Sequence, residues 1–228
     1  MTSTRFPGKT LAPFLDSTLL EHILGRLKGG RHPVDIRVAT STEPSNDPIV
    51  EACDRAGVPV GRGPELDVLA RFAQTIEAMP ERPDVVVRLC ADRPFVGTSL
   101  VDDLLDAYFE LGEPDLLANN RPPSYPYGLD LEVMKMRALL EAAAESSDPY
   151  EREHVTPFLE RRPERYRVVN LTCPFGNFSQ VRVVVDTPAD YEAMQVVGRR
   201  LRELDPRPDH RDLLNLYAVE PELFATSP

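Results

Sequence analysis

The stretch DVVVRLCADRP, residues 84–94, decides the fold of this chain. Val85, Val86 and Val87 form an uninterrupted β-branched run, which is typical of strands covered on both faces. We therefore predict a central parallel strand over residues 84–89. Asp92 then falls just beyond the carboxyl end of that strand, where ligands bind in sheets of this kind.

Segments of strand length and of helix length alternate on both sides of this stretch. Further strands are predicted over residues 34–39, 58–60, 115–118, 129–136, 165–171 and 180–185. Helices are predicted over residues 48–55, 65–79, 98–111, 137–145, from 148 towards 159, and 189–204, with a short one within 209–224. Strands separated by helices favour crossover connections and a sheet covered on both faces. The prediction is an α/β fold, a three-layer α/β/α sandwich with a mainly parallel sheet. It forms one domain over residues 1–228, of which 205–228 are a C-terminal helical tail.

Length and charge exclude several classes of function. The 228 residues suffice for one domain. A net charge of -11 argues against broad binding to nucleic acid, which depends on neutralised phosphates. No stretch approaches the ~20 apolar residues of a bilayer span, and residues 1–9 lack the apolar run of a secretory signal. We expect a cytoplasmic protein that binds neither nucleic acid nor membrane, while a small anionic ligand in a local basic pocket remains compatible.

The start of the chain concentrates groups that bind phosphate. Ser3, Thr4, Arg5, Gly8 and Lys9 lie within seven residues and offer hydroxyls, backbone N–H groups and two positive charges. The pattern departs from the P-loop because Ser3 stands where the first glycine of that motif belongs, which weakens a simple ATPase hypothesis. The alternative is a frayed basic terminus.

Two aspartates follow predicted strands and are candidate ligands of Mg2+, which binds phosphates through one or two carboxylates. Asp92 follows the valine-rich strand, and Asp186 follows the strand predicted over 180–185. The alternative for Asp92 is an ion pair with Arg88 or Arg93. The alternative for Asp186 is a helix N-cap, a role that aspartate performs well.

Two further acids could bind a polar ligand, and a charged helical segment follows them in the sequence. Strand alternation places Asp130 and Glu132 on one face, where they could bind sugar hydroxyls or an amine, or could simply be solvated. Arg152 and His154 belong to a charged helical segment that would ordinarily be a salt-bridged surface. The sequence contains no zinc motif, nucleophile elbow or dinucleotide fingerprint.

These pieces together resemble the cytidylyltransferase family that includes the spore-coat polysaccharide SpsF proteins and, more distantly, the CMP-Kdo and CMP-acylneuraminate synthetases. The matching segments follow the family order over nearly the whole chain: residues 3–9, 38–41, 67–72, 88–94, 128–132, 152–157 and 185–188. The resemblance implies the nucleotide-diphospho-sugar transferase fold and a homodimer.

The resemblance also implies a reaction and a role for each candidate residue. CTP and a sugar acid, of the nonulosonate kind, would give a CMP-sugar and pyrophosphate, for glycan or specialised-metabolite biosynthesis. Arg5, Lys9 and Asp92 would be catalytic, and Mg2+ would bind Asp92 and Asp186. The nucleotide would contact Ser3, Thr4, Arg5, Lys9, Ala39, Thr40, Ser41, Asp67 and Arg71, and the acceptor would contact Asp130, Glu132, Arg152 and His154. The alternatives are another acceptor, such as a phosphonate or a sugar phosphate, or a catalytically silent homologue with a binding or assembly role.

Members of this family normally begin with an apolar strand and an Ala-Arg pair ahead of the position that Met1 occupies here. The chain therefore resembles the family without its usual first strand, which is central to the family's sheet. The two explanations are a start assigned to an internal methionine and a truncated homologue. We expect the former.

Overall fold

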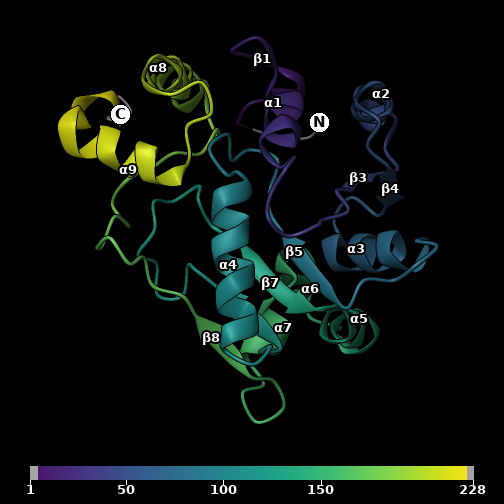
Figure 1. Ribbon diagram of the computed structural model, residues 1–228. Coiled ribbons are helices and arrows are strands. Elements are labelled where there is room, and N and C mark those ends of the chain that lie inside the picture. The colour runs from purple at the N-terminus through teal and green to yellow at the C-terminus, as the bar shows by residue number, and fades with distance from the viewer. Residues whose placement is uncertain (1–4, 225–228) are drawn as a thin grey trace.

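The computed structural model describes residues 5–224, and it confirms the predicted α/β class (Figure 1). Its largest sheet has the strand order β5-β7-β6-β8. A separate parallel pair, β3 and β4, lies to one side. The strands of these two sheets are β3 (Val38–Ser41), β4 (Val60–Gly63), β5 (Val85–Arg88), β6 (Leu116–Ala118), β7 (Glu132–Lys135) and β8 (Val168–Asn170).

Helices surround these strands (Figure 1). The α-helices are α1 (Leu19–Arg26), α2 (Asp47–Ala56), α3 (Val68–Glu77), α4 (Thr98–Glu110), α5 (Met136–Glu145), α6 (Pro149–His154), α7 (Pro157–Glu160), α8 (Pro188–Leu204) and α9 (His210–Val219). Three short 3-10 helices and a β-hairpin are the remaining elements of residues 5–224: η1 (Lys9–Leu11), β1 (Pro13–Phe14), β2 (Ser17–Thr18), η2 (Pro44–Asn46) and η3 (Pro221–Phe224).

The main sheet is mixed, whereas the sequence predicts a mainly parallel one. β7 runs antiparallel to both β5 and β6, and β8 runs parallel to β6. The reason lies in the connection from β6 to β7, which is a loop without a helix. A chain that returns through such a loop pairs antiparallel, because a parallel neighbour requires a longer crossover.

Several predicted elements begin or end elsewhere. The strand predicted from residue 34 begins only at Val38, and the segment 180–185 forms a single bridge from Arg182 to Tyr127 instead of a strand. The helix predicted from 148 towards 159 is broken at Val155, whose φ is 73°. Pro157 follows two residues later and cannot donate a helical hydrogen bond, so a new helix starts there. Helix α1 was not predicted, although Thr18 begins it with a capping box.

The core brings the C-terminal segment into the domain. Buried side chains of α4, β6, β7, α8 and α9 form one continuous cluster. Leu213, Leu214 and Leu216 of α9 belong to this cluster, so the predicted helical tail packs as part of the domain. A second cluster joins α3 to α5 and α7, and it includes Leu116 and Met134 of the main sheet.

Candidate active site

Lys9 holds together two loops that are far apart in the sequence. It opens η1 directly after Gly8, whose φ of 77° is a left-handed conformation that glycine adopts without strain. The Lys9 ammonium donates hydrogen bonds to Asp92 Oδ2 at 2.8 Å, to Asp186 Oδ1 at 3.1 Å and to the Val185 carbonyl at 2.7 Å. All three of its protons are thereby used, and the two carboxylates share one cation.

The backbone brings the two aspartates to one place. Asp92 lies in the loop after β5, and Asp186 lies directly before α8. The Val185 N–H donates to the Asp92 carbonyl at 2.9 Å, which fixes one loop against the other. The structure therefore brings together Lys9, Asp92 and Asp186, as the sequence predicts. Asp92 has Lys9 as its partner, and the alternative pairing with Arg88 or Arg93 is wrong.

Asp186 carries its charge at neutral pH. Burial tends to raise the pKa of this carboxyl group, but hydrogen bonds from Lys9 and Arg182 outweigh burial and lower the pKa. The Arg5 guanidinium lies 3.4 Å from the other oxygen of the same carboxylate and is 65% exposed, so it remains accessible to a ligand. The N-cap alternative for Asp186 is wrong, because Thr187 caps α8.

Arg182 and Asp190 complete the charge pattern, and neither was predicted as a site residue from the sequence. Arg182 donates to Asp186 at 2.9 Å and to Asp190 at 3.0 Å. Asp190 also accepts from the backbone N–H groups of Asp186 and Thr187, which orients the Asp186 backbone. The sequence carried two signals for this arrangement. The arginine lies four residues before Asp186, and a Thr-x-x-Asp capping box starts at Thr187.

The predicted phosphate cradle is described only in part. Ser3 and Thr4 lie outside the described residues, so their role stays a prediction. From Arg5 onwards the segment contacts the aspartate loops, and Lys9 is largely buried. This contradicts the alternative of a frayed basic terminus for Lys9.

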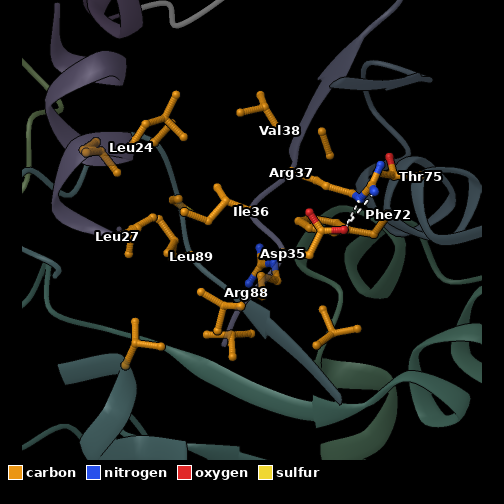
Figure 2. Close-up of a pocket in the computed structure, with 18 of the residues that line it drawn as sticks. Leu24, Leu27, Asp35, Ile36, Arg37, Val38, Phe72, Thr75, Arg88 and Leu89 are labelled. Atoms are coloured by element: carbon orange, nitrogen blue, oxygen red, sulfur yellow. Dashed lines mark hydrogen bonds and ion pairs between the residues drawn. The ribbon is translucent and has the colours of Figure 1, made fainter. Parts of the chain in front are cut away.

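A cavity of about 860 Å³ lies between β3 and β5 (Figure 2), and its lining includes Thr10 and Ala91, the sequence neighbours of Lys9 and Asp92. Of the residues predicted to contact nucleotide, Ala39, Thr40, Ser41 and Arg71 line it. Arg71 donates two hydrogen bonds to backbone carbonyls, yet its Nε is buried without a partner among the described residues. A nucleotide that enters this cavity would meet hydroxyls, backbone groups and a guanidinium.

Asp67 has a structural task and does not line the cavity. Its carboxylate caps α3 by accepting from the Ala70 N–H at 2.9 Å. Its other oxygen accepts from Arg152 Nε at 2.6 Å. Arg152 also donates to the Ala143 and Ser146 carbonyls, so it ties α6 to the end of α5 and the start of α3. The contacts of both residues are therefore within the fold, and their substrate roles stay predictions.

Asp130 and Glu132 are buried, which contradicts the alternative of a solvated strand face. Asp130 pairs with Arg93 at 3.2 Å, and burial raises its pKa in spite of that arginine. Glu132 pairs with Arg88 and accepts from the Thr156 hydroxyl at 2.9 Å. The two arginines that flank Asp92 in sequence therefore serve other acids.

Arg121 is a further residue near the site that was not predicted from the sequence. This residue lies in the proline-rich loop and its guanidinium contacts Glu132, Thr156 and Glu160. No local motif in the sequence marks it. His154, in contrast, is exposed at the end of α6 and lies 4.4 Å from the Tyr150 ring, so its role in acceptor binding stays a prediction.

The donor set at the centre of the site suits a hard divalent cation. Asp92 and Asp186 are both carboxylates, and both already direct an oxygen at one positive charge. Within residues 5–224 there is no group of three or more His, Cys, Asp or Glu side chains that could hold a metal. A magnesium ion bound here would therefore need ligands from phosphate and water, as this ion commonly does.

No helix in the described part of the chain is long and apolar enough to cross a membrane.

Comparisons with known proteins identify relatives of this sequence. Residues 1–205 match the family model described as cytidylyltransferase. The spore coat polysaccharide biosynthesis protein SpsF of Bacillus subtilis is 33% identical over 216 residues, which cover 92% of this chain and 86% of SpsF. A 3-deoxy-manno-octulosonate cytidylyltransferase of Anaeromyxobacter is 32% identical over 106 residues, covering 46% of this chain and 42% of that protein.

Two solved structures are similar to the structure of this chain. A cytidylyltransferase from Leptospira borgpetersenii superposes with a TM-score of 0.91 at 28% identity, covering all of this chain and 94% of its own. A CMP:2-keto-3-deoxy-manno-octonic acid synthetase in complex with CTP superposes with a TM-score of 0.62 over 87% of this chain and 94% of its own. At 16% identity, that second likeness shows a common fold.

Proposed function

Because this chain belongs to the cytidylyltransferase family of CTP-dependent nucleotidyltransferases, we propose that it transfers CMP from CTP to a sugar acid and releases pyrophosphate. The acceptor would be of the nonulosonate kind, in glycan or specialised-metabolite biosynthesis. The observation that carries the proposal is the convergence of Asp92 and Asp186 on the Lys9 ammonium, with Arg5 beside them.

In the proposed reaction an acceptor oxygen attacks the α-phosphorus of CTP in line. The new oxygen–phosphorus bond forms as the bond to the β-phosphate oxygen breaks, and the acceptor hydroxyl loses its proton. Arg5 and Lys9 would hold the triphosphate, Lys9 by exchanging its hydrogen bonds to the two carboxylates for bonds to phosphate oxygens, and both would offset the negative charge on the departing pyrophosphate. Such a reaction depends mainly on positioning and electrostatics, so a cluster of fixed charges is the appropriate machinery.

Asp92 and Asp186 would hold Mg2+ in this proposal. Bound there, the ion would withdraw negative charge from the phosphates. The two carboxylates are held close together because Lys9 bridges them. Arg182 donates to the other oxygen of Asp186 and so fixes its orientation. We also propose that Asp130 and Glu132 shape the binding site of the acceptor sugar. We propose in addition that the enzyme is a homodimer, which light scattering can test.

Pyrophosphate release tests the proposal directly. CTP, with and without Mg2+, is supplied with a panel of nonulosonic acids, and UTP, ATP and GTP serve as controls. We expect release that depends on CTP, on Mg2+ and on one acceptor class. Phosphonates and sugar phosphates in the same panel identify the alternative acceptors. Release with none of these compounds, together with no CTP-induced thermal shift, would contradict the proposal and favour a silent homologue.

A further inference from the structure

Tyr127 is an exposed aromatic residue in an otherwise buried stretch of chain. Nine of the ten residues 125–134 are buried, and Tyr127 is the exception, with 45% of it exposed. The stretch continues into β7 and includes Asp130 and Glu132, which we propose to shape the binding site of the acceptor sugar. These two acids are almost fully buried and each is paired with an arginine, so they offer little surface to a ligand. Tyr127 is therefore the side chain of this stretch that a bound acceptor can reach most easily.

Backbone pairing fixes the position of Tyr127. Its N–H donates to the Val181 carbonyl at 2.8 Å, and its carbonyl accepts from the Val183 N–H at 2.8 Å. These two bonds form the parallel bridge between Tyr127 and Arg182. Gly128 permits the close approach, because its φ is 112° and a Cβ there would lie 2.6 Å from the Val183 carbonyl oxygen. The backbone of Tyr127 is therefore firmly placed, and its side chain starts from a fixed point.

The ring of Tyr127 is held by the arginine that also holds Asp186. The guanidinium carbon of Arg182 lies over the Tyr127 ring, 5.1 Å from its centre, which is a cation–π arrangement. The same guanidinium donates hydrogen bonds to Asp186 at 2.9 Å and to Asp190 at 3.0 Å. One face of the ring is thereby covered, whereas the rest of the ring is open to solvent. A ring that is already oriented loses little conformational freedom when a ligand packs on it.

Tyr127 lies outside the cavity that we assign to the nucleotide. Four residues predicted to contact nucleotide line the cavity between β3 and β5, but neither Tyr127 nor Arg182 does. Arg182 nevertheless contacts Asp186, one of the two carboxylates proposed to hold Mg2+. In the proposed reaction the acceptor hydroxyl has to reach the α-phosphorus at this cluster, and the nucleotide occupies its own cavity. The ring therefore lies beside the cluster and outside the nucleotide's cavity, which is the place that an acceptor has to occupy.

We propose that Tyr127 is a specificity-determining residue, a platform on which the apolar face of a cyclic acceptor packs. The proposal rests on the proposed function, and it narrows the acceptor to a sugar ring with a patch of C–H groups on one face. Such C–H groups carry a slight positive charge, and the face of an aromatic ring is the negative part of its quadrupole. Open-chain acids and small phosphonates lack such a face and would gain nothing from the ring.

The first test is steady-state kinetics with the nonulosonic acid that gives the fastest pyrophosphate release. Tyr127→Leu removes the ring, Tyr127→Phe keeps it, and Phe109→Leu is the matched control. Phe109 is 46% exposed, close to the value for Tyr127. It lies near the C-terminal end of α4, whereas Asp92 precedes the N-terminus of that helix.

We expect Tyr127→Leu to raise the KM of the acid about 10-fold, because an aromatic face packed on apolar groups contributes affinity of this order. Its kcat and its KM for CTP should stay within about twofold of the parent, as they do when an interaction with only one substrate is lost. Tyr127→Phe and Phe109→Leu should keep all three constants. An unchanged KM for the acid, or a fall in kcat alone, would overturn the proposal, because the ring would then at most position Arg182. Equal losses in the leucine and phenylalanine variants would also overturn it, since the hydroxyl and not the ring would then bind the acid.

The second test is binding followed by NMR, and it does not depend on activity. Protein with isotope-labelled tyrosine rings is titrated with each cyclic acid of the panel in the presence of CTP and without Mg2+. The Tyr127 signal is identified by its absence in Tyr127→Phe. We expect it to move with at least one cyclic acid and to stay in place with the borohydride-reduced, open-chain form of the same acid.

The outcomes of this titration separate the platform from the proposed function. A Tyr127 signal that moves with no cyclic acid would overturn the proposal, and so would equal shifts with the cyclic and the open-chain form. A shift that is specific to the cyclic form, without pyrophosphate release from any acid, would refute the proposed function and leave the platform standing.

Discussion

Replacing Asp92 by asparagine should abolish turnover at a modest cost in stability. Asp92 accepts one charged hydrogen bond, from Lys9 at 2.8 Å, and the two side chains are 22% and 13% exposed. A hydrogen bond to a charged group contributes about 1.5–3 kcal/mol, and partial exposure reduces this to about 1–2 kcal/mol. For a domain of this size the melting temperature would fall by roughly 2–8 °C. The rate should fall by about 10³-fold or more, which corresponds to ~4 kcal/mol of transition-state stabilisation.

Asp115→Asn is the matched control for Asp92→Asn. Asp115 is also a buried carboxylate, bound by Arg137 at 2.6 Å and Lys135 at 3.3 Å, but it lies at the opposite end of the sheet. Both variants are assayed for CTP-dependent pyrophosphate release at 25 °C and for thermal unfolding. We expect Asp115→Asn to lose stability and keep its rate. If Asp92→Asn keeps more than a tenth of the rate, or loses no more than the control, the assignment of Asp92 is refuted.

Three further predictions concern stability. Burial lowers the pKa of His22 to about 4 from its ordinary 6.5, so the unfolded chain binds more protons than the folded chain between these values. The contribution of His22 to the free energy of unfolding should be fully present above pH 6.5 and should fall by up to about 3 kcal/mol as the pH drops towards 4. His22→Gln should remove this pH dependence, as measured by urea titrations. Glu132→Gln leaves the buried Arg88 without a counter-charge and should lower the free energy of unfolding by about 3 kcal/mol. The control Glu153→Gln, at an exposed position, should change it by less than about 0.5 kcal/mol, and equal effects would contradict the pairing of Arg88 with Glu132. Gly61→Ala would place a Cβ 2.0 Å from the Thr75 hydroxyl oxygen and should destabilise the protein by about 1–3 kcal/mol, and a melting temperature equal to that of the parent would contradict this packing.

The sequence predicts most elements of the fold because their local patterns agree with their surroundings. The apolar face of residues 65–79 predicts a helix, and α3 lies there. The β-branched run at 85–87 predicts a strand, and β5 lies there. The antiparallel direction of β7 could not be predicted, because it depends on how the loop after β6 returns. Residues 180–185 have strand-like composition, but only Arg182 makes a bridge, so their partners and not their propensity decide their state.

Some residues of the candidate site could be predicted from the sequence, whereas their pairings could not. Asp92 and Asp186 could be found because each follows a segment that ends at the same edge of the sheet. Pairings across the structure were not visible in the sequence. Arg88 and Arg93 flank Asp92 but serve Glu132 and Asp130 instead, since those acids are buried and need counter-charges.

The charge cluster around Lys9 has a consequence for how an anion arrives. Within residues 5–224, three cations, Arg5, Lys9 and Arg182, face three carboxylates, Asp92, Asp186 and Asp190, so these six side chains together carry no net charge in a chain whose net charge is -11. An approaching triphosphate therefore feels long-range repulsion from the molecule and no compensating attraction until it is close. Added salt would screen that repulsion, so capture of the nucleotide would become faster with ionic strength, the reverse of electrostatic steering.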